Sequence, residues 1–197
     1  MGLHKNYERE TIAQKAMEVF WREGYHGTST QALVDAMGVN RFSVYAEFGN
    51  KQNLYEAALA AYDKEVVNAH FQALESAQAG LSDIEDMLQG LTEAAGQPGS
   101  ELGCFMCNCA TERAPYDPGS QGFVHRHVER ISAALANALA HAQQAQQIRA
   151  DVDVTQQGQF LATLLLGVFV LLRAQVSADV VRASAQTALQ HLRQLRT

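Results

Sequence analysis

The sequence predicts an all-α protein, for three reasons. Apolar residues recur every three or four positions, as at Ile12, Ala16, Val19 and Phe20, which places them on one helix face. Long stretches are rich in Ala, Gln, Leu and Glu, which favour helices, and the chain has only three prolines. In no segment do Val, Ile and Thr alternate with polar residues, the pattern that predicts a strand.

The length and composition suit a small domain joined to a medium-sized one. The chain has 197 residues, of which 47% are hydrophobic, as is usual for a folded globular protein. We place an N-terminal three-helix domain at residues 7–54 and a helical C-terminal domain at residues 55–197. A helix that starts near Lys51 is expected to connect the two.

Four helices are expected in the first third of the chain. The first runs from about residue 7 to residue 23 and ends at Gly24. Two short helices follow, joined at Gly38, where glycine can adopt the left-handed conformation of a tight turn. Hydroxyls of residues 28–30 and the side chain of Asn40 are suited to cap them. The fourth helix opens at residue 50 or 51 and continues past Phe71.

Five more helices are expected in the C-terminal part. Ser82 and Glu85 have the spacing of a capping box, which predicts a helix start at residue 82. Loops rich in Gly and Pro are expected at residues 96–100 and 115–120, and a turn at residues 151–153. The helices should cover approximately residues 82–95, 102–114, 121–146, 155–176 and 178–195.

Charge is divided unevenly along the chain. The net charge is −6, from 15 Lys and Arg against 21 Asp and Glu. Residues 1–54 hold six of each kind, so the acidity lies entirely in the C-terminal part. The negative total therefore does not argue against a nucleic-acid partner for the N-terminal domain. A neutral domain implies modest non-specific affinity for DNA.

Residues 28–54 have the order helix, short glycine-containing turn, helix. This shape lays a recognition helix in the major groove of DNA. Residues 7–54 also resemble the DNA-binding domain of the TetR family of transcriptional repressors. Two positions depart from the family pattern: Phe42 stands where Gly is common, and Glu47 where His or Tyr is common. The matching residues are Ile12, Ala13, Ala16, Phe20, Gly24, Tyr25, Thr28, Ser29, Leu33, Val34, Ala36, Met37, Gly38, Val39, Val44, Tyr45, Phe48, Lys51 and Leu54.

The resemblance implies a sequence-specific transcriptional regulator, a repressor that a small-molecule effector releases from double-stranded operator DNA. By carry-over from the family, Thr28, Ser29 and Thr30 would bind phosphates, and Tyr45 and Lys51 would reach the DNA backbone. The recognition helix would present Asn40, Arg41, Phe42 and Ser43 to base edges. A helical protein that binds another protein, and not DNA, is the alternative from a different class.

The resemblance also implies a homodimer and an effector pocket in the C-terminal domain. Residues 160–172 are apolar nearly all round, so this helix needs cover on several sides, either within the monomer or from a second copy. The run is too short to span a bilayer. We expect the dimer interface at Leu161, Leu165, Phe169, Val181, Ala185, Ala188 and Leu192. An apolar or aromatic effector would contact Tyr62, Phe71, Met87, Leu91, Cys104, Phe105, Asn108, Phe123 and His127.

The three cysteines leave several interpretations open. Cys104, Cys107 and Cys109 lie on one expected helix and are small enough to be core residues. Alternatively, Cys104 is a reactive thiol in a first helical turn, which would make the protein a redox or electrophile sensor. A metal site with His125 and His127 is the weakest of the three interpretations.

The sequence offers no basis for catalysis. We find no Ser, His and Asp set and no phosphate-binding glycine loop, so we expect no enzyme, no cofactor and no metal. The first ten residues are polar and lack the apolar core of a signal peptide, which favours a cytoplasmic protein.

Overall fold

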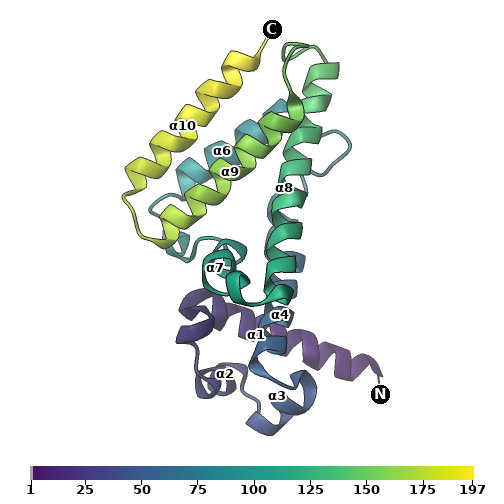
Figure 1. Ribbon diagram of the computed structural model, residues 1–197, viewed down its shortest axis with the longest axis vertical. Helices are drawn as coiled ribbons and strands as arrows, with labels where there is room; N and C mark the ends of the chain where they lie inside the picture. The colour runs from purple at the N-terminus through teal and green to yellow at the C-terminus, as the bar shows by residue number, and fades with distance from the viewer. Residues whose placement is uncertain (1) are drawn as a thin grey trace. The chain divides into compact units, whose positions relative to one another are not determined.

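The chain folds into α-helices, as predicted (Figure 1). The computed structural model describes the backbone of residues 2–197, and side chains from Arg9 onward except that of Ser43. Within these residues the extended structure is limited to one isolated bridge, Ile148 to Arg196. The helices are α1 Gly2–Gly27, α2 Thr30–Met37, α3 Arg41–Phe48, α4 Lys51–Tyr62, α5 Asn68–Phe71, α6 Leu81–Ala94, α7 Phe105–Glu112, α8 Pro118–Gln144, α9 Val154–Arg173 and α10 Ala178–Leu195.

Two compact units divide the chain in a way that the sequence did not indicate. The first unit combines residues 1–69 with residues 105–124, and the second combines residues 70–104 with residues 125–197. The expected boundary at residues 54 and 55 therefore lies inside the first unit. Helix α7 and the start of α8 belong with the N-terminal helices.

In the first unit, α1 packs against α4 and also contacts α2 and α7. Aromatic rings fill the centre. The Tyr55 ring meets the Phe20 ring edge to face at 5.0 Å and the Phe105 ring at 5.4 Å. Because edge-to-face pairs add about 0.5–1.5 kcal/mol each to area burial, this cluster fixes α7 on the N-terminal helices.

The breaks between α1, α2 and α3 confirm the predicted glycine positions. Gly24 interrupts α1 with φ of 76° and ψ of 170°. Ser29 caps α2, since its hydroxyl oxygen accepts the Ala32 N–H at 3.0 Å. Gly38 ends α2 in the left-handed conformation at φ 69°. Helix α2 is thus short because a side-chain cap at Ser29 begins it and a left-handed glycine at Gly38 ends it.

The fourth expected helix reaches Phe71 but does not continue past it, and it is not uniform. Asn50 caps α4 through its side-chain oxygen and the Asn53 N–H at 2.8 Å. Residues Asp63–Val67 then form a π-helical turn before α5. Such bulges accommodate one extra residue in a helix and were not predicted by the apolar pattern.

In the second unit, α10 packs on α6 and on α9. Its apolar line of Val181, Ala185, Ala188 and Leu192 is fully buried. Helix α9 crosses α8 closely at Gly158, where an added Cβ would lie 2.8 Å from the Ser132 carbonyl oxygen and 2.8 Å from the Ala136 nitrogen. Glycine is therefore required at this crossing.

Three helix starts differ from the predictions. Helix α6 is capped by the Asp83 carboxylate, which accepts the Gly80 N–H at 2.8 Å, so the Ser82 and Glu85 box does not form. Gly103, at φ 61°, delays α7 to residue 105. Helix α8 begins at Pro118 because Asp117 accepts the Ser120 N–H at 2.7 Å and proline suits the first helical position.

Helix α9, at Val154–Arg173, lies close to the helix predicted at residues 155–176. With 20 residues it is long and apolar enough to cross a bilayer, by length and composition only. Apolar helices in soluble protein cores and interfaces have the same properties. Only 28% of its apolar window is buried inside the chain, so its remaining surface needs another explanation.

Candidate nucleic-acid interface

The recognition helix expected from the sequence is α3. Val44 and Phe48 point inward and are buried, and α3 contacts α2 and α4. Arg41, Phe42 and Ala46 are exposed. Phe42 has 83% of its surface exposed, more than any other large hydrophobic side chain that the structure describes. Asn40, just before the helix, is exposed as predicted, whereas the side chain of Ser43 lies outside the described residues.

Two of the predicted backbone-binding hydroxyls lie together where α2 meets α3. The Thr30 Oγ1 and the Tyr45 hydroxyl are 3.3 Å apart. The Arg41 guanidinium carbon is 5.5 Å from the centre of the Tyr45 ring. The hydrogen bond with Thr30 is the main cause that lowers the pKa of Tyr45, and Arg41 lowers it further. The arrangement presents a cation and a polarised hydroxyl, both suited to a phosphate.

Ser29 and Thr28 behave differently from each other. Ser29 is exposed at the start of α2, where first-turn N–H groups have no partner within the helix and attract phosphates. Thr28 is buried, and its hydroxyl donates to the Gly24 carbonyl oxygen at 2.6 Å. The Thr28 side chain thus closes the α1 to α2 connection, and the structure does not support a phosphate contact through its hydroxyl.

Lys51 also has a different position from the expected one. Its ammonium donates to the Tyr25 carbonyl oxygen at 2.5 Å and lies 4.4 Å from the centre of the Tyr25 ring. Burial lowers the pKa of this ammonium. In this structure Lys51 stabilises the end of α1, so the structure does not support the family-derived contact with the DNA backbone.

Glu112, which the sequence analysis did not identify, also stabilises the connection between α1 and α2. Its two carboxylate oxygens accept the backbone N–H groups of Tyr25 at 2.8 Å and His26 at 2.7 Å. A Cβ at Gly24 would lie 2.9 Å from Glu112 Oε2. No pattern in the sequence relates α7 to residues 24–26, so only the fold could reveal this contact.

A polar network extends from Glu112's neighbour Arg113. Its Nε donates to Gln52 Oε1 at 2.8 Å, and Gln52 Nε2 donates to Asp117 at 2.7 Å. Asp117 also accepts the Ser120 N–H, and this bond is the main cause that lowers the pKa of its carboxyl. The network ties α4 to α7 and α8 inside the first unit.

Glu47 has an internal partner that accounts for its departure from the family pattern. It pairs with Arg9 at 3.2 Å, and the Arg9 guanidinium lies 5.0 Å from the centre of the Phe48 ring. The acidic side chain thus joins α3 to α1. Since it is paired, it adds less repulsion towards a phosphate than a bare carboxylate would.

Comparison with known families agrees with this geometry. The family of bacterial regulatory proteins named tetR matches residues 12–58, and the tetracyclin repressor-like C-terminal domain matches residues 80–191. The second match alone spans more than half of the chain. The chain belongs to the TetR family. It is a helix-turn-helix transcriptional regulator, as the resemblance implied.

Similar proteins extend over nearly the whole chain. The HTH-type repressor ComR of Escherichia coli is 29% identical over 95% of this chain and 90% of its own. The uncharacterized regulator YezE of Bacillus subtilis is 28% identical over 92% and 93%. A structure of the TetR family regulator CifR, a cysteine mutant complexed with 26-base-pair operator DNA, is 26% identical with a TM-score of 0.78. That match covers 92% of this chain and 95% of CifR.

TetR regulators are typically dimers with an effector site in the C-terminal domain. The predicted effector residues fall into both units of this chain. Tyr62, Phe105, Asn108 and Phe123 belong to the first unit, where the Tyr62 and Phe105 rings are 5.7 Å apart. The second unit contains the remaining five predicted residues: Phe71, Met87, Leu91, Cys104 and His127.

Two of these residues in the second unit are in contact. The Cys104 Sγ lies 3.6 Å from the His127 Nε2, and both side chains are buried. His127 Nδ1 is buried without a hydrogen-bond partner. Since buried polar atoms are nearly always paired, this nitrogen is a candidate point for a ligand's polar group.

The structure does not favour the interpretation of Cys104 as a sensor. Only 2% of Cys104 is exposed, and it precedes α7 and does not lie in its first turn. Both the burial and the position remove the reasons for expecting a reactive thiolate. Cys107 and Cys109 are buried too, and burial raises the pKa of the Cys109 thiol. The three cysteines are core residues. Among the described residues no group of three His, Cys, Asp or Glu side chains is placed to hold a metal ion.

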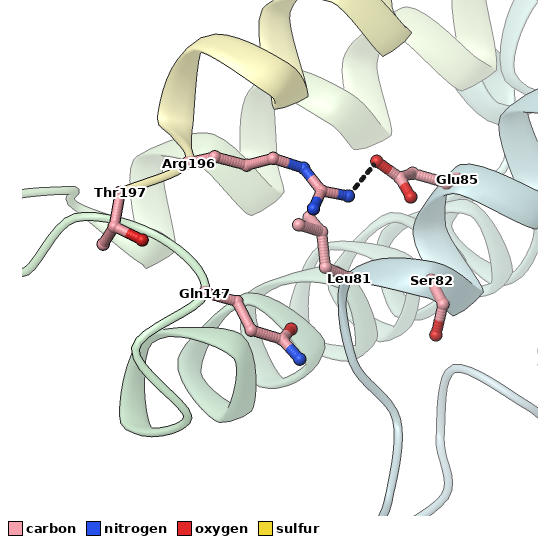
Figure 2. Close-up of a pocket in the computed structure, with 6 residues that line it drawn as sticks. All are labelled: Leu81, Ser82, Glu85, Gln147, Arg196 and Thr197. Atoms are coloured by element: carbon pink, nitrogen blue, oxygen red, sulfur yellow. Dashed lines mark hydrogen bonds and ion pairs between the residues drawn. The ribbon is translucent and has the colours of Figure 1, made fainter.

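A pocket of about 320 Å³ lies elsewhere in the second unit (Figure 2). It is lined by none of the predicted effector residues. The Arg196 guanidinium in it already pairs with Glu85 at 2.8 Å, as the dashed line in Figure 2 shows. A polar pocket with a neutralised cation does not suit an apolar effector. Its lining residues are Leu81, Ser82, Glu85, Gln147, Arg196 and Thr197.

The predicted dimer residues need correction. Leu161, Leu165, Val181, Ala185, Ala188 and Leu192 are buried within one chain, and of the predicted residues only Phe169 is partly exposed. The apolar pattern was read correctly, but α10 uses its line against α6 and α9 of the same chain. The exposed apolar side chains of this region are Phe160, Val170, Val176 and Val180.

Proposed function

We propose that the protein is a repressor that binds operator DNA as a homodimer through α2 and α3. A small, largely apolar molecule that binds in the C-terminal helical part then releases it. The protein would act in the cytoplasm, where its DNA is, and the proposal assigns it no catalysis.

One observation carries the DNA-binding part of the proposal. α3 packs through Val44 and Phe48 and leaves its opposite face in solvent, next to the Thr30, Arg41 and Tyr45 group. A helix exposed in this way, preceded by a capped helix and a tight turn, has the geometry that enters the major groove.

The second face of α9 supports the homodimer. Phe160 and Val170 are 46% and 44% exposed, and Val180 on α10 is 45% exposed. These side chains belong to the two helices through which we expect a second copy to pack, in the manner of a four-helix interface. Burial of this face by a partner also accounts for the small buried share of α9 in one chain.

His127 is our candidate for the polar contact of the effector. Its Nδ1 is buried and unpartnered, and the predicted residues Phe71, Met87 and Leu91 of the same unit are apolar. An effector with an apolar body and one hydrogen-bonding group would fit this chemistry. Pairing of the buried nitrogen would then add to the affinity.

Chain connectivity suggests how the effector acts on DNA binding. Helix α7 begins at the residue after Cys104, and its last residue, Glu112, holds the backbone of Tyr25 and His26 just before α2. A displacement of α7 would loosen this hold and change the spacing of the two recognition helices. Coupling of about 1–3 kcal/mol is typical of such regulators and is enough to release DNA.

The test is a mobility-shift titration with DNA from upstream of the gene and a scrambled fragment of equal length. We expect the upstream DNA to bind at least about a thousandfold more tightly at physiological salt. Equal affinity for both fragments, repeated with fragments from the flanking genes, would refute the proposal. A His127→Ala variant that still binds DNA but no longer responds to an identified effector would support the effector site.

A further inference from the structure

Two apolar residues lie on the face of α3 that points away from the rest of the first unit. At 100° per residue, Phe42 and Ala46 lie on the side of α3 opposite to the buried Val44 and Phe48. Both Phe42 and Ala46 are exposed. They therefore project furthest from the body of the first unit, into the space that a groove of DNA would occupy.

Phe42 and Ala46 themselves cannot form side-chain hydrogen bonds with bases. Neither residue has a side-chain donor or acceptor. The nearest cation, Arg41, is placed on the flank of the helix, with its guanidinium carbon 5.5 Å from the centre of the Tyr45 ring. Arg41 is thus directed towards the hydroxyl pair of Thr30 and Tyr45, a setting for the phosphate backbone.

The major groove offers one apolar feature to such a face. Each base pair presents donors and acceptors there, and only thymine adds a methyl group, which phenylalanine and alanine side chains contact in direct readout. An exposed phenylalanine in water costs free energy, and burial against a methyl group recovers it. The small side chain of Ala46 leaves room for α3 to approach the base edges closely.

We propose that Phe42 determines specificity by packing against thymine methyl groups in the operator, with Ala46 providing the close approach. This inference rests on the proposed DNA-binding function and gives it a base preference. The neutral charge of residues 1–54 strengthens the argument, because a domain with little net positive charge depends more on base contacts for its affinity.

The experiment begins with the full-length wild-type protein and a pool of random double-stranded DNA. Repeated selection by the protein yields its preferred half-site. Each thymine of this half-site is then replaced in turn by deoxyuridine, which removes only the methyl group. Fluorescence anisotropy gives the affinity of wild type, Phe42→Ala and a control, Tyr116→Ala. Tyr116 is an exposed aromatic residue outside α3, with 77% of its surface in solvent.

We expect at least one thymine whose replacement weakens wild-type binding about fourfold, the effect of one buried methyl group. Phe42→Ala should bind the unmodified site more weakly and lose this sensitivity. Tyr116→Ala should keep both the affinity and the sensitivity of wild type. Because Phe42 is exposed, its replacement should leave the unfolding transition unchanged, so a loss of affinity cannot be ascribed to misfolding.

Two results would overturn the inference while leaving the proposed function intact: a selected half-site in which no deoxyuridine replacement weakens binding, or a penalty that is equal in wild type and in Phe42→Ala. A selection that enriches no sequence at all would instead refute sequence-specific DNA binding itself. The failures of the two proposals are thereby distinguishable.

Discussion

At the scale of single residues, the connection between α1 and α2 depends on hydrogen bonds from three side chains. Lys51 donates to the Tyr25 carbonyl oxygen, Glu112 accepts two backbone N–H groups, and Thr28 closes back on Gly24. Each satisfies a backbone group that a bend in the chain leaves without a helical partner. The position of α2, and with it the helix-turn-helix, rests on these side chains.

Glu112→Gln should destabilise the protein by about 1–3 kcal/mol. The amide keeps one acceptor, but its NH₂ group faces a backbone N–H and leaves that donor unsatisfied. The measurement is urea unfolding at fixed protein concentration. The control is Glu93→Gln, an exposed glutamate on α6. Equal midpoints for the two variants would contradict the role given to Glu112.

Arg41→Ala and Tyr45→Phe should each weaken operator binding without unfolding the protein. Arg41 is exposed, and Tyr45 lies in contact with Thr30 and Arg41 beside the recognition face. If both residues contact phosphates, the affinity for DNA should fall by a similar factor on different operator sequences. Arg41→Ala should also reduce the salt dependence of that affinity by the contribution of about one phosphate contact. Unchanged affinity in both variants would remove this group from the interface.

The residues that could be predicted from sequence were those with a local chemical reason. Ser29 as a cap and Gly24 and Gly38 as breaks follow from neighbours along the chain. Thr28 and Lys51 were assigned to phosphates by resemblance, and the structure gives them inward contacts. Glu112 was missed because its partners lie about 86 positions away.

At the scale of elements, α9 carries two apolar faces with different uses. One face is buried against the same chain and includes Gly158, whose missing side chain lets α9 approach the backbone of α8. The other face leaves Phe160 and Val170 exposed. Sequence periodicity identified the helix but could not tell which face is used inside the chain, because both are apolar.

Gly158→Ala should lower the free energy of unfolding, although alanine is the better helix former by about 1 kcal/mol. The new Cβ would lie 2.8 Å from two backbone atoms of α8, and such overpacking costs about 1–3 kcal/mol. Gly90→Ala on α6, with no atom within 4 Å of the added Cβ, should be neutral or stabilising. Thermal unfolding of the two variants separates these effects, and a Gly158→Ala protein as stable as Gly90→Ala would disprove the close crossing.

Element boundaries were less predictable than element types. The positions of α9 and α10 follow their apolar patterns closely. The starts of α6, α7 and α8 differ, since Asp83, Gly103 and Asp117 set them through local caps or a left-handed residue that the apolar pattern does not report. The π-helical turn at Asp63–Val67 has no signature in the sequence that we could use.

At the scale of the whole molecule, the sequence correctly predicted the TetR family and the all-α fold, and it did not indicate that the two compact units are interleaved along the chain. Helix α7 packs with the N-terminal helices through Phe105 and Glu112. These contacts join residues far apart in the sequence, so no linker or change of composition along the chain indicates them. The contacts that bury the apolar residues of α9 and α10 are long-range too, so the sequence could not show that these residues pack within one chain and not at a dimer interface.

Val170→Glu should convert the dimer to monomers. Val170 lies on the exposed face of α9, and burial of a carboxylate in an apolar interface costs several kcal/mol. The control Val128→Glu changes an exposed valine of α8 and should remain dimeric. Sedimentation at micromolar concentration is the measurement. A wild-type protein that sediments as a monomer, or a Val170→Glu variant that stays dimeric, would contradict this interface.

The central claim is that two α3 helices of one dimer read successive major grooves. The most direct measurement is the affinity of the wild-type protein for its selected operator, with 5 or 10 base pairs inserted between the half-sites. We expect half-sites about one helical turn apart, and a 5-base-pair insertion, which places them on opposite faces of the DNA, should reduce affinity to that of one half-site. An affinity that does not depend on the spacing would contradict the claim.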